Sequence, residues 1–311
     1  MDTPGLTPAD IDAAANRIRS LVRTTPAIPN DGAELGVEGR LTFKLEQLQH
    51  SGTFKARGAS SFLLGSTISS AGVVAASGGN HGAAVAWAAQ QLGHKATIFV
   101  PTISSPAKVE RLRAYGADVR QIGDVYHDSL EASEAFRLES GATGVHAYED
   151  PLVMAGAGTT GREFEAQAGP FDTVLVACGG GGLVGGVATW LGDRTRVVAC
   201  ETTGTDCYAQ ARAAGQPVSM SPSGIAADAL GPKAVGDLAF ERLQAANAES
   251  VVVDDDAVVE ARDLLWDRFR IVAEPSAAVP VAALLAGAFK PGADEHTGVI
   301  VCGANTTISF A

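Results

Sequence analysis

The sequence predicts an α/β protein, and three observations support this fold class. Short runs rich in β-branched residues recur along the whole chain, and stretches with a helical pattern separate them. Several of these runs are apolar throughout, as expected of parallel strands that helices cover on both faces. The composition, with 46% hydrophobic and 19% charged residues in 311, is that of a compact protein with one large core or two medium ones.

The elements are predicted to alternate between strand and helix along the chain. The first helix should follow Thr7, which can cap it, and Pro8, which suits the first helical position. Further helices should cover Ala83–Leu92 and Pro106–Tyr115, the second of which ends at Gly116, a residue type that closes helices. Strands are expected at Leu41–Glu46, Gly72–Ala76, Ala96–Val100, Asp118–Ile122, Thr173–Ala177, Arg196–Ala199, Ser250–Val253 and Gly298–Val301.

The net charge and the lack of long apolar runs narrow the range of partners. A formal net charge of −12 argues against nucleic acid and anionic lipid, which are bound by clustered Lys and Arg. No apolar run approaches the ~20 residues that cross a bilayer, and the chain begins without the basic and apolar regions of a secretion signal. We therefore expect a cytoplasmic protein that binds neither nucleic acid nor membrane.

One lysine lies in a segment with unusual features. The segment from Ser51 to Ala59 follows a predicted strand and leads into a helix, and it places Lys55 where the chain turns inward. A lysine that forms an imine must spend time as the free amine, so it needs a fixed, partly desolvated position that lowers its pKa. Lys55 can meet these demands, whereas an isolated lysine is most often a solvated surface charge.

A run of glycines after the strand Thr173–Ala177 indicates a phosphate site. The run is followed by a predicted helix, so strand, glycine turn and helix N-terminus come in order. Such a turn exposes backbone N–H groups to an anion, and the helix dipole adds partial positive charge. Four consecutive glycines suit one compact phosphomonoester.

A dinucleotide site is the competing interpretation of the same glycines. Gly180, Gly182 and Gly185 fit the pattern G-x-G-x-x-G, and Glu201 follows about 20 residues on, where a ribose-binding acid would be. A dinucleotide fold, however, usually begins with its glycine turn, and this turn lies more than halfway along the chain. NAD is therefore the less favoured cofactor.

The segment Ser77–Gly82 also joins a predicted strand to a helix. Its successive N–H groups can hold a substrate carboxylate, and Asn80 can donate an amide N–H to a phenolate oxygen. The alternative is an ordinary turn in which Asn80 caps the helix. His81, taken by itself, is expected to be a packed structural histidine.

Cys302 ends the predicted strand Gly298–Val301 and is followed by a polar tip. A thiol at this position can hydrogen-bond a ring nitrogen and leave it unprotonated, whereas a carboxylate would favour the protonated ring nitrogen. The alternative is a small buried apolar side chain. Cys178 and Cys200 are expected to be buried, reduced thiols.

Taken together, these segments resemble the fold-type II pyridoxal-phosphate (PLP) enzymes, and among them the serine/threonine dehydratase and serine racemase family. The resemblance runs from about Ile11 to Ala311 and includes Arg23–Pro26, Gly224–Asp228 and Glu274–Ala277. It implies a two-lobed fold like that of the tryptophan synthase β subunit, each lobe a mostly parallel sheet flanked by helices. Residues 1–70 and 148–311 would form the large lobe that anchors PLP, and residues 71–147 a small mobile lobe.

The resemblance also implies a role for each residue of the site. Lys55 is similar to the lysine that forms a Schiff base with PLP, and Phe54 would lie beside the ring. Asn80 corresponds to the partner of the phenolic oxygen, Cys302 to the partner of the pyridine nitrogen, and Glu274 to an acid near the cofactor. The phosphate cradle would comprise Gly179, Gly180, Gly181, Gly182 and Leu183, and the substrate-carboxylate loop Ser77, Gly78, Gly79, Asn80 and His81.

The implied activity is that of an ammonia-lyase (dehydratase) that converts L-threonine, L-serine or both to a 2-oxo acid and ammonia. Lys55 would take the α-proton before the β-hydroxyl leaves. Racemases of the family carry a serine just before the Gly-Asn of the carboxylate loop, where this chain has Gly78, so a racemase is the second choice. A lyase for a bulkier or acidic substrate such as hydroxyaspartate, and a non-catalytic PLP or amino-acid binder, are further alternatives.

The resemblance carries two further expectations, on a metal ion and on assembly. Some family members bind Mg²⁺ or Ca²⁺ through an acid after the strand that follows the glycine cradle. Glu201 and Asp206 lie in the corresponding segment, which is one residue shorter here, and the alternative is two solvated surface carboxylates. Family members form dimers or tetramers, so we expect a homodimer or homotetramer that acts on a small amino acid.

Overall fold

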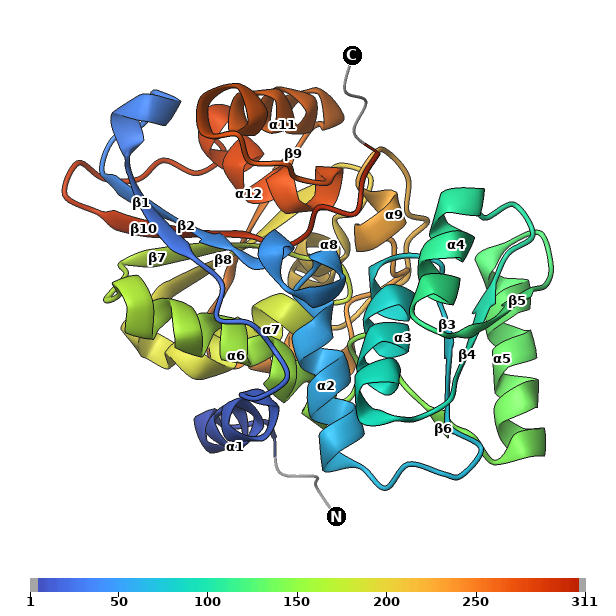
Figure 1. The fold of residues 1–311 in the computed structure, drawn as a ribbon. Coiled ribbons are helices and arrows are strands. Elements are labelled where there is room, and N and C mark those ends of the chain that lie inside the picture. Colours follow the sequence, from blue (N-terminus) through green and yellow to red (C-terminus); the bar gives the residue numbers. More distant parts are fainter. Residues whose placement is uncertain (1–4, 308–311) are drawn as a thin grey trace.

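The computed structural model describes residues 5–307, which form two mostly parallel β-sheets (Figure 1). The larger sheet has six strands in the order β1-β2-β10-β7-β8-β9. β1 runs antiparallel to β2, and all other neighbours in this sheet are parallel. Its strands are β1 (Ala27–Asp31), β2 (Arg40–Leu45), β7 (Thr173–Ala177), β8 (Arg196–Thr202), β9 (Glu249–Val253) and β10 (His296–Val301).

The smaller sheet has four parallel strands in the order β5-β4-β3-β6. They are β3 (Val73–Ala76), β4 (Ala96–Val100), β5 (Asp118–Gln121) and the two-residue strand β6 (Thr143–Gly144). Because the strands are parallel, the loops that follow them meet at one edge of the sheet, where ligands bind in open α/β sheets.

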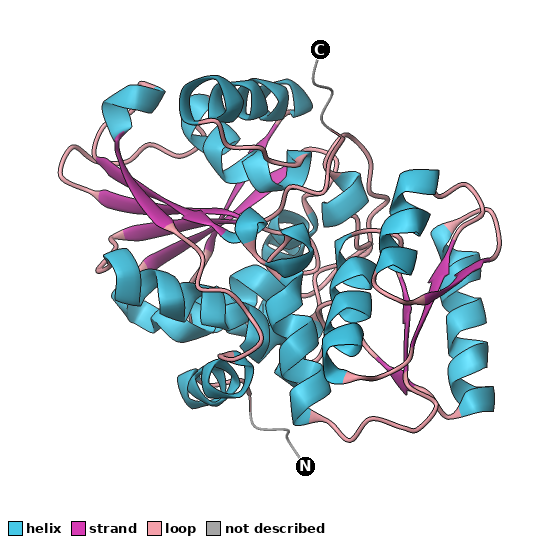
Figure 2. Ribbon diagram, in the orientation of Figure 1, coloured by secondary structure: helices cyan, strands magenta, loops and turns pink. Residues whose placement is uncertain are grey.

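Helices cover both faces of each sheet, as Figure 2 shows. On the larger sheet α11 and α12 lie over one face, and α6 and α7 over the other. On the smaller sheet α5 covers one face, and α3 and α4 the other. The helices are α1 (Pro8–Ile18), α2 (Lys55–Gly65), α3 (Asn80–Leu92), α4 (Pro106–Ala114), α5 (Tyr126–Ser140), α6 (Pro151–Ala168), α7 (Gly182–Leu191), α8 (Cys207–Ala214), α9 (Ala227–Leu230), α10 (Asp237–Ala245), α11 (Asp255–Phe269) and α12 (Pro275–Leu285).

Each sheet has its own hydrophobic core, and α2 connects the two. The core of the smaller sheet includes Ala56, Phe62 and Leu63 of α2, although α2 begins at the site on the larger sheet. The lobe boundaries expected at residues 70/71 and 147/148 stay a prediction. The helix α2 lies before residue 70, in the expected large lobe, yet it packs into the core of the smaller sheet. Residues 1–4 and 308–311 of the expected large lobe lie outside the described residues.

The secondary structure agrees closely with the sequence patterns. Every strand expected from an apolar run is present, and α1 begins with the expected capping box, in which Thr7 and Asp10 bond each other's backbone N–H. The sequence did not predict β1, whose Pro29 is tolerated because β1 is an edge strand. It also missed β6, and α3 begins three residues before Ala83.

Two structural findings bear on the environment of the chain. None of the helices within residues 5–307 combines the length and apolar character that a bilayer crossing requires. All four cysteines are buried and unpaired, as expected for Cys178 and Cys200.

Candidate active site

The backbone joins the lysine segment to the segment of Cys302. Thr53 and Gly303 form an isolated β-bridge, and the Phe54 N–H donates to the carbonyl oxygen of Cys302 at 3.0 Å. These bonds hold Lys55, the next residue after Phe54, beside Cys302 at the carboxyl end of β10. The structure therefore brings together two site residues that lie 247 positions apart, the difference between residue numbers 302 and 55.

Lys55 is the first residue of α2, and its amine is fixed by one strong contact. Nζ donates a hydrogen bond to the carbonyl oxygen of Ala147 at 2.7 Å and lies 5.2 Å from the centroid of the Phe54 ring. Burial lowers the pKa of Lys55 to about 8, and the nearby Glu274 carboxylate opposes this shift. A useful fraction of Lys55 is therefore the free amine near neutral pH, which imine chemistry requires.

Cys302 lies at the end of β10 and is 4% exposed. Burial, with a smaller contribution from the nearby Glu274 carboxylate, raises the pKa of the Cys302 thiol far above its usual range. The thiol is therefore neutral. It can form a weak hydrogen bond with a ring nitrogen, but it does not stabilise a protonated, positively charged ring nitrogen as a carboxylate partner would.

Asn80 belongs to a network of buried and half-buried polar side chains. Its amide N–H donates to Glu274 Oε1 at 2.6 Å, and its amide oxygen accepts from the side chain of Asn305. Glu274 also accepts from the Ser276 hydroxyl and from the Asn305 backbone, yet burial still raises the pKa of its carboxyl group. The capping interpretation of Asn80 is wrong, because Gly79 is the N-cap of α3 and no side chain caps this helix.

The four glycines that lead from β7 into α7, the last of which begins α7, form a tight turn that admits no side chain. A Cβ on Gly180 would lie 2.6 Å from the Tyr148 ring, and a Cβ on Gly182 would lie 2.9 Å from the Tyr148 Cβ atom. Gly181 has a φ of 88°, in the left-handed region that favours glycine. The backbone N–H groups at the start of α7 thus stay bare, and the turn fits the phosphate of PLP.

The carboxylate loop leads from β3 into α3. The Ser77 hydroxyl accepts the Gly79 N–H at 3.2 Å, so it is turned toward its own backbone. A Cβ on Gly78 would meet only ordinary contacts, with Val100 and the Ser104 hydroxyl both at 3.5 Å. His81 is buried and its Nε2 lies 2.9 Å from the Val145 carbonyl oxygen, and burial and Lys55 lower the pKa of His81 to about 3.

The sequence interpretation missed two parts of the site. One is Ser104 after β4, and the other is the loop after β6 with Ala147, which holds the Lys55 amine, and Tyr148, which packs on the glycine turn. Both follow strands that neighbour β3 in the smaller sheet, so the strand order would have indicated them. Because β6 is only two residues long, its residues carry no recognisable strand pattern.

A buried network of charged side chains fixes the start of α2 against its neighbouring elements. The Arg57 guanidinium donates to both carboxylate oxygens of Glu46 at 2.7 Å and to Glu163 at 2.9 Å. Lys44 donates to the same Glu163 oxygen at 2.6 Å. These contacts join β2, α2 and α6 two residues from Lys55, and the two carboxylates raise the pKa of Arg57 against the effect of burial.

Glu201 is fully buried, so the expectation of a solvated surface carboxylate is wrong for this residue. Its oxygens accept the backbone N–H groups of Tyr208 and Ala209 and the Ser250 hydroxyl, at 2.7 to 2.8 Å. Burial raises its pKa to about 7, and these donors oppose the shift. Because three donors already share its two oxygens, Glu201 is engaged within the fold and does not present a free carboxylate to a ribose hydroxyl, as the NAD interpretation required. Nor is Glu201 paired with Asp206 around a metal position: within residues 5–307 no group of three His, Cys, Asp or Glu side chains could hold an ion.

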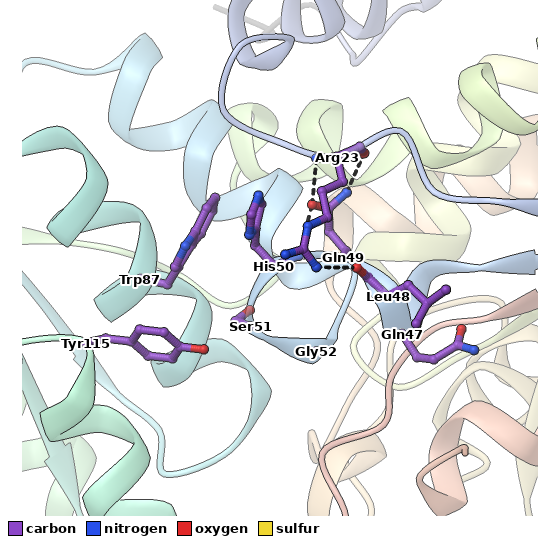
Figure 3. Close-up of a pocket in the computed structure, with 9 residues that line it drawn as sticks. All are labelled: Arg23, Gln47, Leu48, Gln49, His50, Ser51, Gly52, Trp87 and Tyr115. Carbon is purple, nitrogen blue, oxygen red and sulfur yellow. Dashed lines mark hydrogen bonds between the residues drawn. The ribbon is translucent and has the colours of Figure 1, made fainter. Parts of the chain in front are cut away.

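Two hollows lie near the lysine segment. One has a volume of about 380 Å³ and is drawn in Figure 3, where the His50 ring stacks on Trp87 with centroids 4.5 Å apart. Its lining residues are Arg23, Gln47, Leu48, Gln49, His50, Ser51, Gly52, Trp87 and Tyr115. The other, of about 200 Å³, is lined by Asp228, Glu274 and Asn305 among others. Only the second contains a predicted site residue, so the first is separate from the candidate active site.

Comparison with known proteins gives a consistent family. The family model described as "Pyridoxal-phosphate dependent enzyme" matches residues 18–303. The chain is 36% identical to a phenylserine dehydratase of Ralstonia pickettii, over 96% of this chain and 93% of that protein. It is 34% identical to a serine racemase of Oryza sativa subsp. indica, over 96% and 90%. The solved structure of a T.th. threonine deaminase matches with a TM-score of 0.91 and 35% identity, over 97% and 99%.

Proposed function

The chain belongs to the pyridoxal-phosphate dependent enzymes, and from this premise we propose that it is a dehydratase acting on L-threonine, L-serine or both. Its cofactor is PLP and not NAD. When bound, PLP supplies an aldehyde that reacts with amines and a ring that withdraws electrons from the substrate α-carbon. The products would be a 2-oxo acid and ammonia.

We assign the cofactor contacts to residues whose surroundings fit them. The amine of Lys55 would react with the aldehyde, and Phe54 would lie against the ring. The bare N–H groups of the turn from Gly179 to Leu183 would hold the phosphate. Asn80 would reach the phenolic oxygen and Cys302 the ring nitrogen, with Glu274 holding the Asn80 amide in place.

The proton chemistry would rest on Lys55. The free Lys55 amine would take the substrate α-proton, because its lowered pKa of about 8 leaves a fraction of it unprotonated near neutral pH. The Ala147 carbonyl, 2.7 Å from Nζ, would keep the amine aimed at the reacting carbon. The neutral Cys302 thiol would leave the ring nitrogen unprotonated, which would favour prompt loss of the β-hydroxyl.

One observation carries the choice of dehydratase over racemase: the loop has no proton-carrying side chain at Gly78. The Ser77 hydroxyl is bonded to the Gly79 N–H and is turned away from this role. Proton exchange from the second face of the α-carbon would then be slow, and elimination would dominate. The Ser77 to His81 loop would hold the substrate carboxylate with its N–H groups.

The test uses purified enzyme with L-threonine, L-serine, D-serine, 3-phenylserine and 3-hydroxyaspartate. Formation of 2-oxo acid and the enantiomer ratio are followed together. We expect oxo acid from L-threonine or L-serine without racemisation. Enantiomer exchange that is faster than oxo-acid release contradicts the proposal, and a PLP-loaded protein that is silent with every substrate would be a binding protein.

A racemase is the second candidate, and Ser104 is the observation that favours it. Its hydroxyl lies 3.5 Å from the position of a Cβ on Gly78, so it could supply a proton where Gly78 cannot. If it does, Ser104→Ala should abolish racemisation and leave elimination intact. The matched variant Gly78→Ser, which the structure accommodates at ordinary contact distances, should instead raise racemisation.

A lyase for a bulkier substrate is the third candidate. Ile103 and Val125, in the loops that follow β4 and β5, are 77% and 55% exposed, and Tyr126, the first residue of α5, is 57% exposed. These loops belong to the same sheet edge as the carboxylate loop, so an apolar β-substituent could contact them. A kcat/KM for 3-phenylserine well above that for L-threonine would support this candidate, and a preference for 3-hydroxyaspartate would favour the acidic alternative.

The assembly and the location are part of the same proposal. We propose a homodimer or homotetramer, as the family resemblance implies, and light scattering of the PLP-loaded enzyme would measure its size. The four unpaired cysteines are compatible with a reducing compartment such as the cytoplasm.

A further inference from the structure

The carboxylate of Glu201 caps a helix from an unusual position. It lies on β8, six residues before α8 begins, and its Oε1 accepts the N–H of Tyr208 at 2.7 Å. Its Oε2 accepts the N–H of Ala209 and the hydroxyl of Ser250, both at 2.8 Å. Asp206, the residue at the cap position itself, makes no capping bond.

This arrangement does not fit a divalent cation. The two backbone N–H groups that face the carboxylate present partial positive charge, and the dipole of α8 adds to it. A cation at Glu201 would compete with these donors for the carboxylate and would meet their partial positive charge. Asp206 is directed elsewhere, because its Oδ1 accepts from the side chain of Gln210 at 2.8 Å.

The capped helix is in turn attached to the glycine turn. Cys207 is the first residue of α8 and is fully buried, and its thiol donates to the carbonyl oxygen of Gly179 at 3.0 Å. Gly179 begins the phosphate cradle. The position of α8, which Glu201 fixes, therefore sets the orientation of the first peptide group of the turn.

We propose that Glu201 is a positioning residue for the phosphate end of PLP, and that this chain joins β8, α8 and the glycine turn through Glu201 and Cys207 without a metal ion. The proposal needs the cofactor but not the proposed substrate, so it stands or falls independently of the dehydratase assignment.

The first test compares Glu201→Gln with Asp206→Asn, which removes the same charge five residues away. Apo-protein is titrated with PLP, and the phosphorus resonance of the bound cofactor is recorded by ³¹P NMR. We expect Glu201→Gln to weaken PLP binding by about tenfold or more and to shift the resonance. The carboxamide has one acceptor oxygen where the carboxylate has two, so it cannot accept from all three donors that surround Glu201. Asp206→Asn should resemble the unchanged protein.

A second variant keeps the proposal testable if Glu201→Gln does not fold. Cys207→Ala leaves the cap intact and removes only the thiol bond to Gly179, so it should weaken PLP binding and shift the same resonance. The positioning role would be refuted if both variants kept the wild-type PLP affinity and an unshifted resonance. If Glu201→Gln is unfolded, the same result in Cys207→Ala alone would refute it.

The second test addresses the metal directly. Calorimetric titration of the PLP-loaded enzyme with MgCl₂ and CaCl₂ should give no binding that depends on Glu201, and EDTA should leave the Tm and the PLP affinity unchanged. Saturable binding of either ion that disappears in Glu201→Gln would overturn the inference.

Discussion

At the scale of single residues, Gly180 illustrates how the absence of a side chain forms a site. The Tyr148 ring lies against its backbone, so Gly180→Ala would force a Cβ to within 2.6 Å of the ring. We expect weaker PLP binding and a loss of about 1–3 kcal/mol in the free energy of unfolding. Denaturant unfolding and a PLP titration measure both.

The control for this variant is Gly292→Ala, where the nearest atom to the new Cβ is 3.7 Å away and φ is not in the left-handed region. It should leave PLP affinity unchanged. Equal effects of the two substitutions would show that the Tyr148 contact does not decide the need for glycine.

Lys55 gives a prediction in pH. Because burial lowers its pKa to about 8, the amine is mostly protonated and unreactive below that pH and becomes free above it. In apo-protein, its labelling by an amine-reactive reagent, followed by mass spectrometry of the Lys55 peptide, should rise with a midpoint near pH 8. A midpoint near the ordinary lysine value of about 10.4 would contradict the desolvated environment.

Sequence reasoning proposed Lys55, Asn80, the glycine turn and Cys302 as site residues because each belongs to a segment with a distinctive local pattern at or after a strand. It did not find the contacts among them. The partners of Asn80 are Glu274 and Asn305, which lie 194 and 225 residues further along the chain. No local pattern carries information on such pairs, because only the meeting of α12, α3 and the last loop creates them.

At the scale of elements, Arg57 ties α2 to β2 and α6. Replacing Arg57 by Met would leave Glu46, which is fully buried, without its charged partner. We expect a loss of about 3–5 kcal/mol in the free energy of unfolding, as for other broken buried ion pairs. Denaturant unfolding measures this loss.

Arg113→Met is the matched control, because Arg113 and Glu110 form an exposed pair on α4. Its effect should be below about 1 kcal/mol. A loss from Arg57→Met as small as that of the control would mean that the buried network contributes little to holding α2.

The elements themselves were largely predictable, for a physical reason. Parallel strands buried on both faces, such as β4 and β7, are apolar runs that stand out from their surroundings. β1 escaped notice because half of it faces solvent at a sheet edge, so its residues need not be apolar. The role of Glu201 as a cap was equally hidden, since it comes from a different element than the helix it caps.

At the scale of the whole molecule, one ion pair links the helices around the smaller sheet to the loops of the larger one. Lys108 on α4 lies 2.5 Å from Asp228 on α9, and the backbone oxygen of Asp228 is 3.8 Å from the position of a Cβ on Gly79. Both side chains are partly exposed, so the pair should add at most about 1 kcal/mol to stability.

Its effect should instead appear in substrate binding. We expect Lys108→Met to raise KM several-fold with little change in Tm, and high salt to have the same effect on the unchanged enzyme. Arg137→Met, which breaks the exposed pair with Glu134 within α5, is the control. A KM that is unchanged in Lys108→Met would show that the pair does not help to hold the carboxylate loop.

The two-sheet architecture followed from the strand pattern and the family resemblance, but the course of α2 did not. Its first residue belongs to the site on the larger sheet, while Phe62 and Leu63 pack into the other core. The hydrophobic pattern of a helix indicates that the helix is buried, but it does not indicate which sheet the helix packs against.

The Lys55 amine is proposed as the group that binds PLP covalently. Borohydride reduction of the PLP-loaded enzyme, followed by proteolysis and mass spectrometry, locates the bound cofactor on the chain. We expect the reduced cofactor on the peptide that contains Lys55 and on no other. Label on a different lysine, or an unlabelled Lys55 peptide from fully loaded enzyme, would contradict it.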